Sequence, residues 1–160
     1  MGVTTAIAAG SLVKQTKIGQ AADTNAAEQN PICVFTKPFN SLSFDELADR
    51  IAELGFDGIE APVRKGGHVE PEHVEQKLPA LVEALKKRDL EITVLTSDVN
   101  DPDDPVTARV LRTAATLGIK RYRMKYYKYD LRQSVLSQIN QWRPKIKQIA
   151  AMNHDFGLTG

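Results

Sequence analysis

The feature that most constrains the fold of this chain is a strand pattern followed by a helix pattern, repeated four times. Short β-branched and aromatic runs begin near positions 32, 58, 91 and 119, and each leads into a segment with helical spacing of apolar residues. Strands and helices that alternate in this way form parallel sheets with right-handed crossovers. The sequence therefore predicts an α/β protein with parallel strands and outer helices.

The helix that follows the first strand pattern is the clearest predicted element. Ser43 and Glu46 form a capping box, and the apolar stripe behind them stops at Gly55. Pro79 predicts a kink or a split in the second helix, and Pro144 predicts a bend in the last helix. The four strands are predicted at 32–39, 58–63, 91–99 and 119–130. The long last helix is predicted at 133–156.

The number of units predicts half of a barrel. Each unit occupies roughly 30 residues, and eight would take about 240, close to the ~250 of a (β/α)8 barrel. The chain holds four units, and Leu158 and Thr159 look like the start of a fifth strand. We therefore expect residues 31–160 to form the N-terminal half of a TIM barrel. Its open strand edges predict self-association.

Composition excludes several classes of protein. The chain has 160 residues, of which 42% are hydrophobic and 26% charged, as in an ordinary globular protein. Its net charge of +1 argues against a general binder of nucleic acid or of a membrane surface. A single cysteine forms neither an internal disulfide nor a Cys-rich zinc site.

Residues 1–30 stand apart from the repeat. The apolar run from Val3 to Val13 has about half the ~20 residues that span a bilayer, and a small-residue cleavage site follows Ala22. The basic segment that normally precedes such a run is missing. We expect a truncated secretory signal, which implies an exported or periplasmic protein, and the alternative is a disordered tail on a cytoplasmic one.

Candidate functional residues lie where the predicted strands end, because ligands bind at the C-terminal ends of parallel strands. Glu60 interrupts an apolar strand, so it either contacts a ligand or forms an ion pair with Lys125 or Arg123. Asp98, at the end of the third strand, either faces the barrel mouth or caps the following loop. Cys33 is expected to be a small buried side chain.

The loop after the second strand carries a second group of candidates. Gly66 and Gly67 let the backbone approach a ligand closely, and Arg64 and His68 could contact a hydroxyl, phosphate or carboxylate group. A plain flexible surface loop is the alternative interpretation. His73 is expected to be exposed to solvent.

The fourth strand pattern mixes basic residues with tyrosines. Strand alternation places Arg123, Lys125 and Tyr127 on one face and Tyr122, Met124 and Tyr126 on the other. Lys125 and Tyr127, near the predicted strand end, are therefore candidate ligand contacts. Nucleic-acid binding by stacking and phosphate contact is the weaker interpretation, because the net charge is close to zero.

Four segments, in their order and spacing, carry a resemblance to a known family. They are SFDELADRIAELGFDGIEAPVR, GGHVEPE, LVEALKKRDLEITVLTSDV and TAATLGIKRYRMKYYKYD. Over residues 32–160 the chain resembles the sugar phosphate isomerase/epimerase group with a xylose isomerase-like TIM barrel. No GxSxG, P-loop, GxGxxG or HExxH motif points to a different chemistry.

The resemblance implies an enzyme that isomerises or epimerises a sugar or polyol by proton transfer next to a carbonyl, using Mn, Mg, Zn or Co. The family's metal ligands come from strands five to eight. No metal ligand, cofactor or catalytic residue is therefore assigned to this chain, and the chain alone is expected to be inactive. What carries over is a set of substrate contacts: Glu60, His68 and Lys125.

Two other functions remain open at this stage. An AP endonuclease of the endonuclease IV type has the same barrel but needs His and Glu at the ends of strands two to four. The sequence offers Val63, Asp98 and Tyr129 or Asp130 near those places. The other alternative is a non-catalytic half-barrel that binds a partner.

Overall fold

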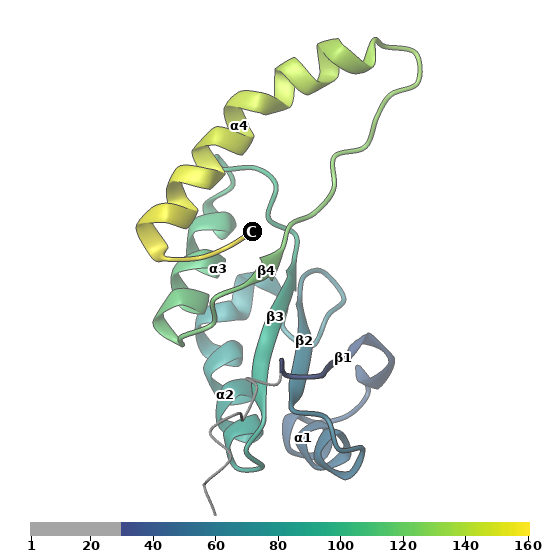
Figure 1. Ribbon diagram of the computed structural model, residues 1–160, viewed down its shortest axis with the longest axis vertical. Coiled ribbons are helices and arrows are strands. Elements are labelled where there is room, and N and C mark those ends of the chain that lie inside the picture. The colour runs from purple at the N-terminus through teal and green to yellow at the C-terminus, as the bar shows by residue number, and fades with distance from the viewer. Residues whose placement is uncertain (1–29) are drawn as a thin grey trace, which may run out of the picture.

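The computed structural model describes residues 30–160 and shows a four-stranded sheet with helices packed along one face (Figure 1). The strands are β1 (Cys33–Phe35), β2 (Gly58–Val63), β3 (Glu91–Ser97) and β4 (Tyr122–Arg123), in the spatial order β1-β2-β3-β4. All three neighbouring pairs are parallel. Consecutive parallel strands with outer helices are the pattern of half a (β/α)8 barrel, so the predicted fold class is confirmed.

The predicted N-terminal signal, Val3–Val13 with a cleavage site after Ala22, lies outside the described residues. Within residues 30–160, no helix combines the length and the apolar character that a membrane crossing requires.

The helices are α1 (Phe44–Glu53), α2 (Val74–Lys86), α3 (Pro105–Thr116) and α4 (Val135–Phe156). α1 begins with the predicted capping box, in which the Ser43 side chain accepts from the Glu46 amide and the Glu46 carboxylate accepts from the Ser43 amide. The Asp104 side chain caps α3 by accepting from the Val106 amide at 2.9 Å. These side chains satisfy amide groups that have no partner within the helix.

The main hydrophobic core lies between the sheet and helices α1–α3. From the sheet, Ile59, Ala61, Val63 and Leu95 are fully buried. The helices add a set of equally inaccessible aliphatic side chains: Leu47, Ile51, Leu78, Leu81 and Leu85. Complete burial of one such large side chain contributes about 1.5–3 kcal/mol. This layer fixes the positions of the strand ends, where the candidate site lies.

Three strands are shorter than their sequence patterns predict. β3 ends at Ser97 instead of residue 99, and the differences in β1 and β4 are larger. β1 ends at Phe35 instead of Phe39, because Lys37–Phe39 form a 3-10 turn with Pro38 in it. It lies at the edge of the sheet, so Cys33 is half-buried rather than buried.

β4 spans only Tyr122–Arg123 instead of residues 119–130. The chain leaves the sheet after Arg123, and two of its tyrosines pack on α4. Tyr127 stacks on Trp142 with ring centroids 5.0 Å apart, and Tyr129 meets the same ring edge-on at 4.8 Å. Aromatic packing on the helix has replaced strand pairing here.

Neither helix with an internal proline is divided. α2 continues through Pro79 and α4 through Pro144. A separate 3-10 turn, Pro71–His73, precedes α2. The second helix is therefore not split at Pro79, whereas the kink at Pro79 and the bend at Pro144 stay predictions.

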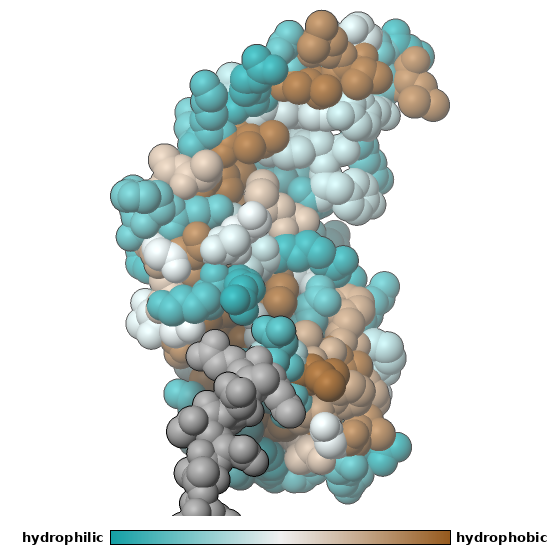
Figure 2. Space-filling model, viewed as in Figure 1, coloured by the Kyte–Doolittle hydropathy of each residue, from teal (hydrophilic) through white to brown (hydrophobic). Residues whose placement is uncertain are grey.

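The last residues lie beside β4, as the sequence predicts. Thr159 forms a parallel bridge with Arg121, and the Thr159 amide donates to the Lys120 carbonyl at 2.9 Å. The fifth strand predicted at Leu158 and Thr159 is represented in the described residues by this isolated bridge alone. The start of α4 and the loop before it project away from the sheet, and Figure 2 shows apolar side chains gathered there. The exposed members are Leu131, Val135, Leu136 and Ile139. Self-association stays a prediction.

Candidate functional site

The two faces of the sheet carry different chemistry. Alternation along β2 turns Ile59 and Ala61 toward the helices and leaves Glu60 on the opposite, inner face. The register then places Phe35 beside Glu60, and Thr96 beside Arg123. In a barrel this inner face lines the interior, and its C-terminal end forms the mouth.

Glu60, Thr96 and Arg123 form a connected polar group on three neighbouring strands. The Thr96 hydroxyl donates to the Glu60 carboxylate, and the Arg123 Nη2 lies 3.0 Å from the same oxygen. Arg123 also donates to the Thr96 Oγ1 at 3.1 Å. Of the two cationic partners considered for Glu60, the structure selects Arg123 and not Lys125. Because its side chain is only 24% exposed, the Glu60 carboxylate needs this compensation.

Phe35 provides an aromatic surface for two guanidinium groups. The Arg123 Cζ lies 5.5 Å from the centre of the Phe35 ring, and the Arg64 Cζ lies 5.7 Å from it. Such cation–π contacts hold an arginine over a ring without occupying its hydrogen-bond donors.

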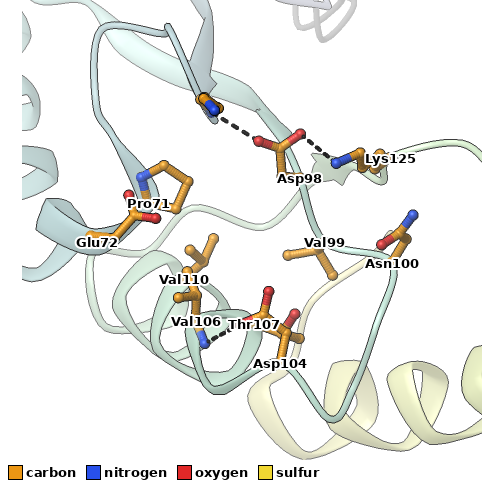
Figure 3. A pocket seen from close by; sticks show the side chains of 11 residues that line it. Pro71, Glu72, Asp98, Val99, Asn100, Asp104, Val106, Thr107, Val110 and Lys125 are labelled. Atoms are coloured by element: carbon orange, nitrogen blue, oxygen red, sulfur yellow. Dashed lines mark hydrogen bonds and ion pairs between the residues drawn. The ribbon is translucent and has the colours of Figure 1, made fainter.

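Asp98 connects the loops that follow β2, β3 and β4. Its Oδ2 accepts from the Lys65 amide at 2.8 Å, and its Oδ1 lies 3.5 Å from the Lys125 Nζ. Figure 3 shows this arrangement, with Asp98 between the two nitrogen atoms. Asp98 therefore faces the mouth and ties down the loop after β2, rather than capping its own loop.

His68 is a structural contact in this structure. A carbonyl can only accept, so the His68 Nε2 donates to the Thr36 oxygen, at 3.0 Å. Burial lowers the pKa of His68, and the hydrogen bond to Thr36 opposes this shift only in part. The imidazole is therefore neutral at pH 7. Thr36 in turn donates its amide to the Glu60 carbonyl at 3.2 Å, which links the loop to β2.

The glycine pair shapes the loop that carries His68. Gly66 has a φ of +70°, which favours glycine, and a Cβ on Gly67 would lie 2.3 Å from the Pro62 carbonyl oxygen. The backbone at Gly67 therefore lies close to Pro62 of β2, whereas the sequence suggested a close approach to a ligand. His73, as expected, is exposed.

Two cavities open at the strand ends, and Asp98 and Lys125 border both. One, of about 320 Å³, lies on the inner side of the strand ends; its other lining residues include Arg64, Thr96, Arg123 and Tyr126. The other, of about 230 Å³, lies toward α3 and includes Glu72, Asn100, Asp104 and Val106 (Figure 3). Of the three predicted substrate contacts, Lys125 lines the cavities, whereas Glu60 and His68 do not.

Sequence reasoning missed the contribution of Thr96 and misplaced Tyr127. Thr96 occupies an inner-face position two residues before Asp98, so strand alternation was the signal that could have found it. Tyr127 does not extend the row of Arg123 and Lys125. Its ring stacks on Trp142 and its hydroxyl donates to the Asn100 carbonyl, because the chain has already left the sheet.

The described part of the chain does not fit the divalent metal that the family resemblance implies. Residues 30–160 contain no group of three His, Cys, Asp or Glu side chains placed to hold an ion. The two inner-face carboxylates, Glu60 and Asp98, are each engaged by a cationic side chain.

Two of the positions where an AP endonuclease would need metal ligands have structural contacts instead. Val63 is buried in the core, and Asp130 pairs with Arg132 at 2.9 Å. The hydrogen bonds from Arg132 lower the pKa of Asp130 to about 2. No observation on these residues favours that function.

Known structures share this fold. D-psicose 3-epimerase, solved in the presence of D-fructose, matches 81% of this chain with a TM-score of 0.54 and 18% identity. D-psicose 3-epimerase with D-tagatose, from Clostridium cellulolyticum H10, matches 81% of this chain with a TM-score of 0.57 and 10% identity. A xylose isomerase domain protein from Alicyclobacillus acidocaldarius matches 80% of this chain with a TM-score of 0.57 and 21% identity.

The matches cover only part of the known structures. The chain spans about half the length of the matching proteins, 50%, 50% and 47% respectively. No profile of a known protein family matches the sequence, and no curated protein does. The chain therefore has a xylose isomerase-like fold over four βα units.

Proposed function

We propose that this chain is part of a sugar or polyol isomerase/epimerase and that it contributes the substrate-binding side of the active site. The observation that mainly supports the proposal is the charged inner face at the C-terminal ends of the strands. The fold that carries this face is shared with sugar epimerases. Arg64, Arg123, Lys125 and Asp98 border a cavity of about 320 Å³ there. The three cationic side chains supply hydrogen-bond donors and Asp98 supplies an acceptor, and this combination suits a ligand rich in hydroxyl groups.

The three predicted contacts take different roles in this proposal. Lys125 contacts the ligand directly, because its ammonium group borders the cavity and is half-exposed. Glu60 holds Arg123 at the inner face, and His68 holds the loop after β2 against Thr36. Glu60 and His68 therefore act as positioning residues.

Proton transfer next to a carbonyl needs an acid–base pair and, in the family, a divalent metal. The described residues do not provide the metal site, so we expect this chain to bind substrate without turning it over. Groups supplied from elsewhere in the complete enzyme would carry out the chemistry.

Calorimetric titration of the chain with D-fructose and D-tagatose tests binding. Half of a barrel surrounds a ligand on one side only, so we expect saturable binding with a Kd of about 1 mM or weaker. Lys125→Met should weaken it about tenfold, and Lys147→Met, on the exposed surface of α4, should not. Absence of saturable binding, or equal effects of the two variants, contradicts the proposal.

Turnover is measured on the same sample with Mn²⁺ or Mg²⁺ added. We expect no epimerisation above a protein-free control. Measurable turnover would show that the described half already contains the catalytic groups.

A further inference from the structure

We infer that the inner cavity contains a subsite for an oxyanion, a carboxylate or phosphate group, and that Arg64 is the residue that recognises it. The inference deepens the proposed function, and rests on it for the nature of the rest of the ligand. The expected ligand is then a sugar or polyol that carries an anionic group. The subsite itself can be tested with simple anions.

The first support is the balance of charge around the cavity. Three cationic side chains border it, and two of them have carboxylate partners: Arg123 lies 3.0 Å from Glu60, and Lys125 lies 3.5 Å from Asp98. Within residues 30–160 the Arg64 guanidinium has neither an ion pair nor a hydrogen bond, so its charge is uncompensated.

The second support is that Arg64 is held in place while its donors stay free. It follows β2 on the inner side, and its Cζ lies 5.7 Å from the centre of the Phe35 ring. This cation–π contact is not a hydrogen bond, and among residues 30–160 the Arg64 guanidinium donates to no other group. Arg64 is half-buried, which reduces the screening of its charge by solvent.

The third support is that the neighbouring groups do not neutralise Arg64. The Glu60 carboxylate already accepts from Thr96 and Arg123, and Asp98 already accepts from the Lys65 amide. An oxyanion in the cavity can receive two parallel N–H bonds from Arg64. The 3.5 Å contact between Lys125 and Asp98 is long for a charge-assisted hydrogen bond, so the Lys125 ammonium can also interact with that anion.

The test is a titration with sodium phosphate, with sodium acetate as a second probe, at constant ionic strength and pH 7.5. Amide chemical shifts of the ¹⁵N-labelled chain report where each anion binds. We expect saturable shifts for Arg64, Thr96 and Lys125 with both probes, and a smaller Kd for phosphate because it carries more charge.

Three variants separate recognition by Arg64 from general attraction of anions. Arg64→Gln should raise the Kd for phosphate at least tenfold, and Arg64→Lys, which keeps the charge without the planar fork, about threefold. Arg109→Gln is the matched control, because Arg109 is also half-buried and has no ion pair among the described residues. It should leave the Kd unchanged. Circular dichroism confirms that each variant is folded.

Two results would overturn the inference. One is an unchanged phosphate Kd in Arg64→Gln, which would mean that Arg64 only packs on Phe35. The other is the absence of saturable binding to the wild-type chain. Titration with uncharged D-fructose separates this inference from the proposed function. Sugar binding without anion binding refutes the oxyanion subsite alone, and anion binding without sugar binding refutes the proposed function alone.

Discussion

The two faces of the four-stranded sheet are built from alternate residues of the same strands, yet they differ in almost every physical property. On the outer face Ile59, Ala61 and Leu95 are fully buried under α1–α3. On the inner face the Arg123 side chain is 57% exposed, and the charged groups Glu60 and Asp98 are paired with Arg123 and Lys125. The outer face therefore supplies the stability of the fold, and the inner face is free to bind a ligand.

The difference also shows why a polar face persists without a helix over it. Removal of a buried carboxylate from water is costly, and Glu60 avoids this cost through Arg123, Thr96 and partial exposure. A sheet that was apolar on both faces would expose a large hydrophobic surface here, which favours association.

The largest expected effect belongs to the outer face. Leu95→Ala should lower the free energy of unfolding by about 2–5 kcal/mol, because it leaves a cavity in the core of the sheet. Urea denaturation followed by circular dichroism measures this. Leu131→Ala, where the side chain is 95% exposed, should change stability by less than about 0.5 kcal/mol. Equal effects of the two variants would mean that the assigned core is wrong.

The capping box of α1 tests the layer that supports the sheet. Ser43→Ala should cost about 1 kcal/mol, because the Glu46 amide loses its acceptor. The nearby Ser41→Ala is the control and should have almost no effect, since Ser41 is exposed. The same denaturation experiment applies, and a cost of Ser41→Ala that matched that of Ser43→Ala would contradict the capping role.

The inner face should respond more weakly to the loss of its ion pair. Arg123→Met should cost about 0.5–1 kcal/mol, because Arg123 is more than half exposed. A double-mutant cycle with Glu60→Gln isolates the interaction. A coupling energy as large as the cost of Leu95→Ala would break the distinction between the two faces.

The smallest effect is the pH dependence that His68 contributes. Burial lowers the pKa of His68 below its ordinary value of 6.5, so the unfolded chain takes up a proton more readily than the folded one. The stability contributed by the neutral imidazole is fully present above about pH 6.5 and is lost as the pH falls toward the lower folded pKa. Unfolding free energies measured from pH 8 to pH 5 report this loss.

His68→Gln keeps a donor for the Thr36 carbonyl and should flatten the stability profile in that range. His73→Gln, at an exposed histidine, serves as the control and should keep the wild-type profile. A profile for His68→Gln that coincides with the wild type would show that His68 is not the group responsible.

Much of the fold could be predicted because local signals and tertiary packing agree. The capping box at Ser43 fixes the start of α1, and the pattern of residues 58–63 gives β2 with its observed bounds. The prediction fails for β4, where Tyr127 and Tyr129 have strand propensity but pack on Trp142 of α4. No single-sequence pattern reveals a partner at that distance along the chain.

The site was only partly predictable for a similar reason. Alternation indicates that Glu60, Arg123 and Lys125 share the inner face, and it offers both Arg123 and Lys125 as partners for Glu60. Which of the two pairs with Glu60 depends on the register between β3 and β4, where Thr96 lies beside Arg123. His68 also looked like a free ligand contact, whereas the fold brings Thr36, which is distant in sequence, to its Nε2.

The most direct test of the central claim is an amide chemical-shift map of the ¹⁵N-labelled chain titrated with D-tagatose. The account predicts saturable shifts at the inner strand ends, at Thr96, Arg123 and Lys125, and none along α1 and α2. Shifts confined to the outer helices, or no saturable shifts at all, would contradict the assignment of the inner face as the ligand-binding surface.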